Sequence, residues 1–307
     1  MVELPVTLAG IKLHNPTVLA SGILGVSASS AALAVAHGAG AVTLKSCGAE
    51  PRLGHRGPTI LPVPGGLLNA VGLSNPGAAA VAHEIRDFRG RCEVPLVASI
   101  FGRTEAEFGE VAAIICDAHP ALLEVNVSCP NVSSEFGTPF GLDHDATARI
   151  TRIVKDIAGT IPVFIKLSPQ AHNIGSLARR CQDAGADGIT AINSVGPGMA
   201  IDVYTRRPIL SNLSGGLSGR AVLPVAVRCV YEIAQNVSIP IIGTGGITTP
   251  EDALQMILAG ATAVGIGTGV HSTGISIFQE VCRGLSEYLE ESGFTGLDDI
   301  RGAANDR

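Results

Sequence analysis

Short apolar runs alternate with longer amphipathic segments along almost the whole chain. Each run holds mostly Val, Ile, Leu and Ala, which is typical of a strand buried on both faces of a parallel sheet. The runs lie at residues 17–20, 41–44, 95–98, 122–125, 162–165, 188–191, 239–242 and 263–266. Strands that alternate with helices in this way predict an α/β fold, a single (β/α)8 TIM barrel over residues 1–307, although the periodicity alone also permits an open, doubly wound sheet.

The segments between the runs have the alanine content and the capping residues of helices. The predicted helices span residues 27–37, 104–118, 143–157, 174–184, 221–235, 250–259 and 275–291. Asp143 suits an N-cap, and Pro250 suits a first helical turn, where no donor is needed. Gly185 and Gly260 follow two of these helices and suit left-handed caps.

Other stretches fall outside this repeat. Residues 6–13 predict an N-terminal hairpin that turns near Gly10 and closes one end of the barrel. Two long loops, at residues 46–76 and 196–220, follow the second and sixth strands, and in a barrel such loops lie over the active site on the C-terminal face. Residues 299–307 have the composition of a frayed polar tail.

The composition narrows the classes of function. The net charge is −6, aromatic residues make up 4% and tryptophan is absent, so the chain lacks the clustered cations and stacking platforms that bind nucleic acid. No apolar run reaches the roughly 18–20 residues of a membrane span, and the first ten residues do not resemble a secretion signal. We therefore expect a soluble cytoplasmic protein with no membrane partner.

The seven cysteines are odd in number and scattered, at positions 47, 92, 116, 129, 181, 229 and 282. No Cys-x-x-Cys pair occurs, so the spacing indicates neither a zinc site nor an iron–sulfur cluster in this chain. Reduced thiols in a reducing compartment fit this pattern best.

Cys129 directly follows a predicted buried strand. Free cysteines usually fill core positions, but this one lies in a strand-end loop, beside a proline and between Asn126 and Asn131. That position is poorly suited to core packing. Cys129 is therefore a candidate nucleophile or proton-transfer group, and Cys47, which has no such amides beside it, is a weaker one.

The strand ends that would meet at the barrel mouth carry lysines, amides, hydroxyls and glycines. They include neither an acidic pair nor a His/Cys cluster, which disfavours glycosidase and metal-hydrolase chemistry. Lys45 and Lys166 end apolar strands, and an unpaired ammonium is costly to bury, so together they indicate a site for negative charge. The glycine clusters at 243–246 and 265–269 lie where many barrels bind phosphate, although either cluster alone is also compatible with a tight turn.

Several motifs, in order along nearly the whole chain, resemble those of dihydroorotate dehydrogenases. The run Asn126-Val-Ser-Cys-Pro-Asn131, followed by residues 140–143, resembles their active-site loop. Residues 69–77 resemble their substrate loop, and residues 192–194 resemble their substrate amide pair. Residues 214–219 and 230–233 are similar to the class 1B branch, whose FMN-binding catalytic subunit works with a separate electron-transfer subunit.

The resemblance implies oxidation of dihydroorotate to orotate in pyrimidine biosynthesis. Cys129 would remove the C5 proton while C6 delivers hydride to N5 of FMN. The implied substrate-binding positions are Lys45, Asn69, Val71, Gly72, Leu73, Asn126, Asn131, Asn193 and Ser194. The implied FMN-binding positions are Ser21, Lys45, Ser46, Ser99, Asn126, Lys166, Ile192, Gly219, Gly245, Gly246, Gly267 and Thr268.

The class 1B resemblance also implies a partner subunit carrying FAD and a 2Fe–2S cluster, with NAD as final acceptor. The implied assembly is a homodimeric catalytic core within a heterotetramer.

Some positions depart from the family pattern. Ser99 stands where an amide is common, Val71 replaces a more common Met or Ile, and residues 46–58 and 270–273 vary. Three alternatives stay open: a dihydrouracil dehydrogenase that binds a neutral ring, a fumarate-dependent dihydroorotate dehydrogenase, and a non-catalytic barrel that binds a phosphorylated ligand.

Overall fold

The computed structural model describes residues 2–127 and 140–305. Among these residues, eight parallel strands close into a barrel in the order β10-β15-β16-β3-β4-β7-β8-β9. The strands are β3 (Thr17–Leu19), β4 (Ala41–Thr43), β7 (Leu96–Ile100), β8 (Leu122–Asn126), β9 (Val163–Leu167), β10 (Gly188–Ala191), β15 (Ile241–Thr244) and β16 (Ala263–Ile266). The predicted barrel is confirmed, and each of the eight predicted runs overlaps one of its strands.

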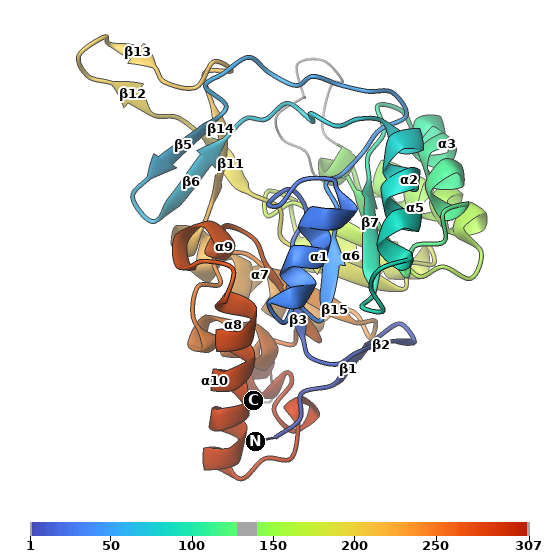
Figure 1. Cartoon of the computed structure of the whole chain (residues 1–307), viewed down its shortest axis with the longest axis vertical. Helices are drawn as coiled ribbons and strands as arrows, with labels where there is room; N and C mark the ends of the chain where they lie inside the picture. The colour runs from blue at the N-terminus through green and yellow to red at the C-terminus, as the bar shows by residue number, and fades with distance from the viewer. Residues whose placement is uncertain (1, 128–139, 306–307) are drawn as a thin grey trace.

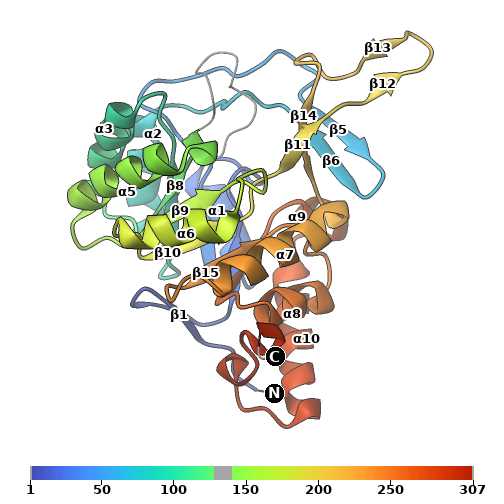
Figure 2. The same cartoon turned by 180° about the vertical axis from the view of Figure 1, so that it is seen from behind.

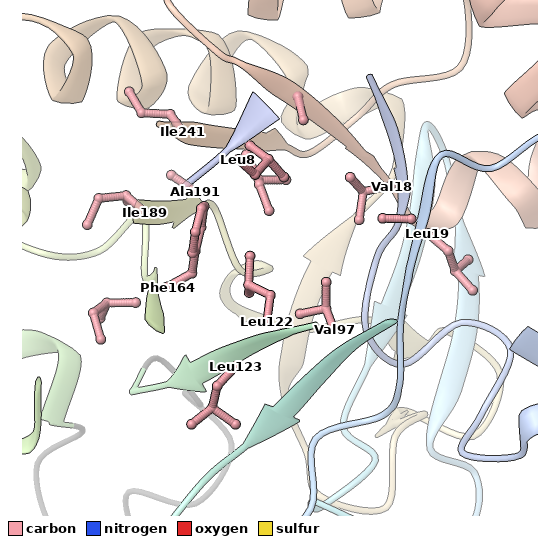
Figure 3. Packing of buried hydrophobic residues seen from close by; sticks show 14 of the residues in the cluster. Leu8, Val18, Leu19, Val97, Leu122, Leu123, Phe164, Ile189, Ala191 and Ile241 are labelled. Carbon is pink, nitrogen blue, oxygen red and sulfur yellow. The ribbon is translucent and has the colours of Figure 1, made fainter. Parts of the chain in front are cut away.

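The barrel strands are buried on both faces, as their continuous apolar sequences predict. Every residue of β9 and of β10 is buried. A Cβ atom added at Gly188 would lie 2.2 Å from the Phe164 ring, so glycine at this position gives the ring room between two neighbouring strands. Figure 3 shows Phe164 among the apolar side chains of the core, near Leu122 and Ile189.

The helices lie outside the barrel strands (Figure 1). They are α1 (Ala28–Ala36), α2 (Ala78–Arg89), α3 (Glu105–Cys116), α5 (His144–Ala158), α6 (Ile174–Asp183), α7 (Leu223–Ala234), α8 (Pro250–Leu258), α9 (Thr268–Thr273) and α10 (Ile277–Ser292), with 3-10 turns η2 (Phe140–Leu142), η3 (Arg220–Val222), η4 (Leu297–Asp299) and η5 (Ala303–Asn305). The Asp143 carboxylate accepts from two backbone N–H groups, so the predicted N-cap is confirmed. Gly185 and Gly260 have φ values of 102° and 118°, as their cap positions require.

The predicted N-terminal hairpin is present. Strands β1 (Val6–Leu8) and β2 (Ile11–Leu13) pair antiparallel, and the turn between them has Gly10 at φ 87°. Leu8 is 1% exposed and lies among barrel side chains such as Ile241 (Figure 3). The hairpin therefore adds apolar side chains to the core of the barrel.

The two long loops carry more structure than the sequence predicted. Strands β5 (Ile60–Val63), β6 (Gly66–Asn69), β11 (Val195–Gly198) and β14 (Gly215–Ser218) form an antiparallel sheet in the order β11-β14-β6-β5, and β12 (Ile201–Asp202) pairs with β13 (Arg207–Pro208). A Cβ at Gly66 would lie 1.8 Å from the Ser218 carbonyl oxygen, so β6 and β14 approach too closely for a side chain there. Figures 1 and 2 show this sheet and the β12–β13 hairpin at the end of the molecule opposite the chain termini.

The prediction of a frayed C-terminal tail is wrong for residues 299–305. Ile300 is 2% exposed, the Gly302 N–H donates to the Ile257 carbonyl, and the Asn305 side-chain amide donates to the Ala259 carbonyl. The last carbonyls of a helix have no partner within it, and these contacts satisfy two of them at the end of α8. The end of the chain is therefore held against α8.

In the part of the chain that the structure describes, no helix combines the length and the apolar character needed to cross a membrane.

Candidate active site

A cavity lies where the carboxyl ends of the barrel strands meet the additional sheet. Barrel strand ends supply most of its wall, and β5, β6, β14 and the segments that follow β6 and β14 supply the remainder. The lining residues include Ala20, Ser21, Gly22, Ile23, Lys45, Ser46, Ile60, Leu67, Asn69, Val71, Gly72, Leu73, Asn126, Lys166, Ile192, Asn193, Ser194, Ser218, Gly219, Val222, Thr244, Gly245, Gly246, Ile247, Gly267, Thr268 and Gly269. Strand ends far apart in the sequence thus converge on one site, as a barrel requires.

Nearly every predicted site residue that the structure describes lines this cavity. The exception is Ser99, and Cys129 and Asn131 lie outside the described residues. Sequence reasoning did not assign a binding role to Ile60, Leu67 or Ser218, because they belong to the sheet within the predicted loops. No local sequence signal places these residues beside the barrel mouth.

Ser99 lies behind the cavity wall. Its side chain is fully buried, and its hydroxyl donates to Glu124 Oε1 at 2.9 Å. The Ser46 hydroxyl, which lines the cavity, lies 2.8 Å from that of Ser99. Ser99 therefore influences the cavity indirectly, through its contact with the Ser46 hydroxyl.

A buried carboxylate beneath the cavity was missed by sequence reasoning. Glu124 lies within a strand that was interpreted as simply apolar, and its side chain is 4% exposed. Its Oε1 lies 3.6 Å from Nζ of Lys166, whose side chain is 8% exposed and also lines the cavity. The sequence does contain a signal for this pair, because a carboxylate in a buried strand needs a cation or a hydrogen-bond donor beside it.

The polar groups of the cavity wall contact one another. Asn126 Nδ2 donates to Ser46 Oγ at 3.4 Å, and Asn193 Nδ2 donates to Asn126 Oδ1 at 3.5 Å. Ser21 Oγ accepts from the Ser46 N–H at 3.2 Å. On the opposite wall, Asn69 Nδ2 donates to the Gly216 carbonyl at 3.1 Å. These contacts fix the orientation of the amides before any ligand is bound.

Glycine occupies the positions after β15 and those after β16 for different structural reasons. Gly245 and Gly246 have φ values of 135° and 82°, and a Cβ on Gly246 would lie 2.7 Å from Leu223. Packing alone therefore requires glycine there. At Gly267 the nearest neighbour of an added Cβ would be 3.6 Å away, which is ordinary contact, and φ is −111°. Packing therefore leaves room for a side chain at Gly267, but its ψ of −99° together with this φ lies outside the regions that L side chains favour, so the backbone conformation accounts for the glycine and the open space beside it leaves room for a ligand.

Cys47 is not suited to be a reactive thiol. It is fully buried and is not among the cavity-lining residues. Burial raises the pKa of its thiol from 9.0 to about 12, despite the opposing effects of a backbone hydrogen bond and of Lys45. The thiol is therefore protonated at neutral pH, and only a thiolate is a strong nucleophile or base.

Within residues 2–127 and 140–305, no three His, Cys, Asp or Glu side chains are grouped as metal ligands.

In characterised TIM-barrel enzymes the active site lies at the C-terminal face of the barrel, which is where this cavity lies. A family model described as dihydroorotate dehydrogenase matches residues 3–289. The chain belongs to the dihydroorotate dehydrogenase family and is an oxidoreductase, which confirms the resemblance seen in the motifs.

The similarity to individual relatives extends over nearly the whole chain. The catalytic subunit of dihydroorotate dehydrogenase B (NAD(+)) from Methanothermobacter thermautotrophicus is 43% identical over 303 residues, which are 99% of either chain. The protein of the same name from Pyrococcus abyssi is 43% identical over 301 residues, 98% of this chain and 99% of the relative. That from Geotalea uraniireducens is 42% identical over 304 residues, 98% of each.

Proposed function

We propose that this chain is an FMN-dependent catalytic subunit that oxidises dihydroorotate to orotate in pyrimidine biosynthesis. The observation that carries the proposal is the cavity itself, in which Lys45 and Lys166 lie with the amides of Asn69, Asn126 and Asn193 at the barrel mouth. Two cations suit an anionic ligand, and each amide offers both a donor and an acceptor, as the edge of a pyrimidine ring requires.

The residues present fit FMN. Apolar side chains such as Ile192, Val222 and Ile247 can contact a flat ring, and the backbone around Gly267 is open to a phosphate group. When bound, FMN would supply the hydride acceptor of the reaction. The proposed FMN-binding residues are Ser21, Lys45, Ser46, Asn126, Lys166, Ile192, Gly219, Gly245, Gly246, Gly267 and Thr268, with Ser99 acting through Ser46.

The substrate would occupy the part of the cavity between β8 and the additional sheet. Lys45 would pair with the substrate carboxylate, and the three amides would bind the ring edges. Val71, Gly72, Leu73 and Ser194 complete this part of the wall. Cys129, three residues along the sequence from the end of β8, would take the proton from C5, and Asn131 would bind the substrate; both roles rest on the motif alone.

The partner proposed for this chain is an electron-transfer subunit that carries FAD and a 2Fe–2S cluster and reduces NAD. The names of the relatives support it, because each is the catalytic subunit of an NAD(+) enzyme. A homodimeric catalytic core within a heterotetramer is the proposed assembly. The six cysteines in the described residues are free thiols, which supports a cytoplasmic location.

An anaerobic titration tests the reaction. The protein is reconstituted with FMN, and dihydroorotate or dihydrouracil is added while the flavin absorbance is followed. Dihydroorotate should bleach the flavin and dihydrouracil should not. Bleaching by dihydrouracil alone would establish the dihydrouracil dehydrogenase instead, and a protein that cannot be loaded with FMN would contradict the proposal.

A second experiment tests the partner. The chain is co-expressed and copurified with a candidate subunit that contains flavin and iron, and NAD reduction by dihydroorotate is measured. The complex should turn over with NAD, whereas the isolated chain should not. Efficient turnover of the isolated chain with fumarate would contradict the partner proposal and favour the fumarate-dependent enzyme.

A further inference from the structure

Glu124 is a buried charge for which the proposed function has no role. In the β8–β9 register, Asn126 is opposite Lys166 and Glu124 is opposite Phe164. Side chains two residues apart share a face of a strand, so the Glu124 carboxylate lies one pleat deeper than Asn126 on the same side. Leu122, two residues before it on the same face, lies near Phe164 in the apolar core (Figure 3). The carboxylate therefore lies between this core and the cavity.

Lys166 is the cation of this pair. It lines the cavity, and its Nζ lies 3.6 Å from Glu124 Oε1. Both side chains are almost completely buried, so little water separates or screens the two charges. A bound ligand would therefore experience the charge of Lys166 reduced by that of the carboxylate beneath it.

The carboxylate also sets the direction in which two hydroxyl groups donate their hydrogen bonds. Ser99 has a single hydroxyl proton, which it donates to Glu124 Oε1. The 2.8 Å contact between Ser46 and Ser99 must then be donated by Ser46. With its proton used in this way, the Ser46 oxygen can only accept, and it accepts from the Asn126 amide. Glu124 thus determines that the Ser46 hydroxyl on the cavity wall acts as a hydrogen-bond acceptor toward the cavity.

We propose that Glu124 is a positioning residue that holds the Lys166 ammonium, lowers the positive charge it presents to the cavity, and so sets the reduction potential of the bound flavin. The inference rests on the proposed binding of FMN. A purely structural role, in which the pair only balances two charges in the core, predicts no effect on the potential.

The test is the midpoint potential of bound FMN in Glu124→Gln, measured by spectroelectrochemistry. Glutamine keeps the size of the side chain and an acceptor for Ser99 but removes the charge. Reduction adds negative charge to the flavin, so a more positive cavity favours the reduced form. We expect the equilibrium constant for reduction to rise about tenfold, equivalent to about +30 mV for a two-electron couple.

Glu107→Gln is the matched control. Glu107 is also a buried carboxylate, with its side chain 9% exposed, and it pairs with Arg103 at 3.0 Å. Neither residue is among those that line the cavity. Both variants lose a paired carboxylate and should melt at a lower temperature, but only Glu124→Gln should shift the potential. A potential unchanged in Glu124→Gln would overturn the inference.

A second comparison applies if Glu124→Gln does not fold because the Lys166 ammonium is left without its counterion. Lys166→Met and the double variant Lys166→Met/Glu124→Gln differ only in the carboxylate, and the double variant should have the higher potential. Equal potentials would overturn the inference and leave the proposed function intact. A wild-type protein that fails to bind FMN would instead overturn both.

Discussion

Replacing Lys166 with methionine should strongly destabilise the FMN-free protein. Lys166 Nζ lies 3.6 Å from Glu124 Oε1, and both side chains are less than a tenth exposed. At that distance and an effective dielectric constant near 20, the attraction between unit charges is about 5 kcal/mol. Removing one partner of a buried pair typically costs about 3–5 kcal/mol, because the remaining charge has no counterion.

This cost is large enough to measure by thermal unfolding. The entropy of unfolding is about 2.1 cal/mol/K per residue, so a chain of 307 residues should lose roughly 5–8 °C in Tm for that cost. Calorimetry of the FMN-free protein at neutral pH measures the change. Lys12→Met, at an exposed position on β2, is the control and should change Tm little.

The double variant Lys166→Met/Glu124→Gln separates the charge from the loss of packing. It removes both charges, so it should melt well above Lys166→Met. The reasoning is refuted if Lys166→Met lowers Tm by less than about 2 °C, or if the double variant is no more stable than the single one. Either result would mean that the carboxylate is solvated without the lysine.

Three further predictions follow from the geometry. Gly188→Ala should lower the free energy of unfolding by about 1–3 kcal/mol in urea, because its Cβ would lie 2.2 Å from the Phe164 ring; no change would mean that the ring can move aside. Burial raises the pKa of the Cys181 thiol from 9.0 to about 12, so its contribution to stability is complete below about pH 9 and is lost as the pH rises toward 12. The fall in stability above pH 9 should therefore be shallower in Cys181→Ala by about 1.4 kcal/mol per pH unit, and an unaltered slope would contradict the pKa. Lys45→Met should weaken orotate binding about 10–100-fold in a flavin-absorbance titration, whereas equal affinity in Lys45→Met and Lys12→Met would exclude a contact with the substrate carboxylate.

The barrel was predictable because its signal is local and repeated. Each strand is a short apolar run, and most of the helices have capping residues that mark where they begin or end. Helix α2 was missed although its buried residues, Val81, Ile85 and Phe88 among them, follow the helical period. It lies directly after the long loop at residues 46–76, and Gly77 at its N-cap offers no side-chain cap to mark where it begins.

The additional sheet was not predictable in the same way. Its strands β6 and β14 come from loops far apart in the sequence, and nothing local in either loop indicates the other. Pro62 within β5 also argues against a strand, except at the edge of a sheet, where β5 lies. Non-local pairing of short, glycine-rich segments is therefore the part of the fold that sequence patterns do not reveal.

In the candidate site, too, some residues were predictable from the barrel and others were not. Strand-end positions such as Lys45, Asn126 and Lys166 follow from the barrel itself, because the strand ends must meet. Individual substrate positions such as Asn69 came from the motif resemblance, since a loop residue has no predictable place in a barrel. Glu124 was missed because one charged residue in an apolar run was interpreted as part of the run.

The sheet that joins the two loops also limits how the site can be changed. Asn69 and Gly216 are 147 residues apart in the sequence, yet the side-chain amide of Asn69, which lines the cavity, donates to the Gly216 carbonyl. A loop transplanted from another barrel enzyme would lose its sheet partner unless the second loop came with it. For evolution and for engineering alike, these two loops form one transferable unit, and substrate preference should change through paired rather than single replacements.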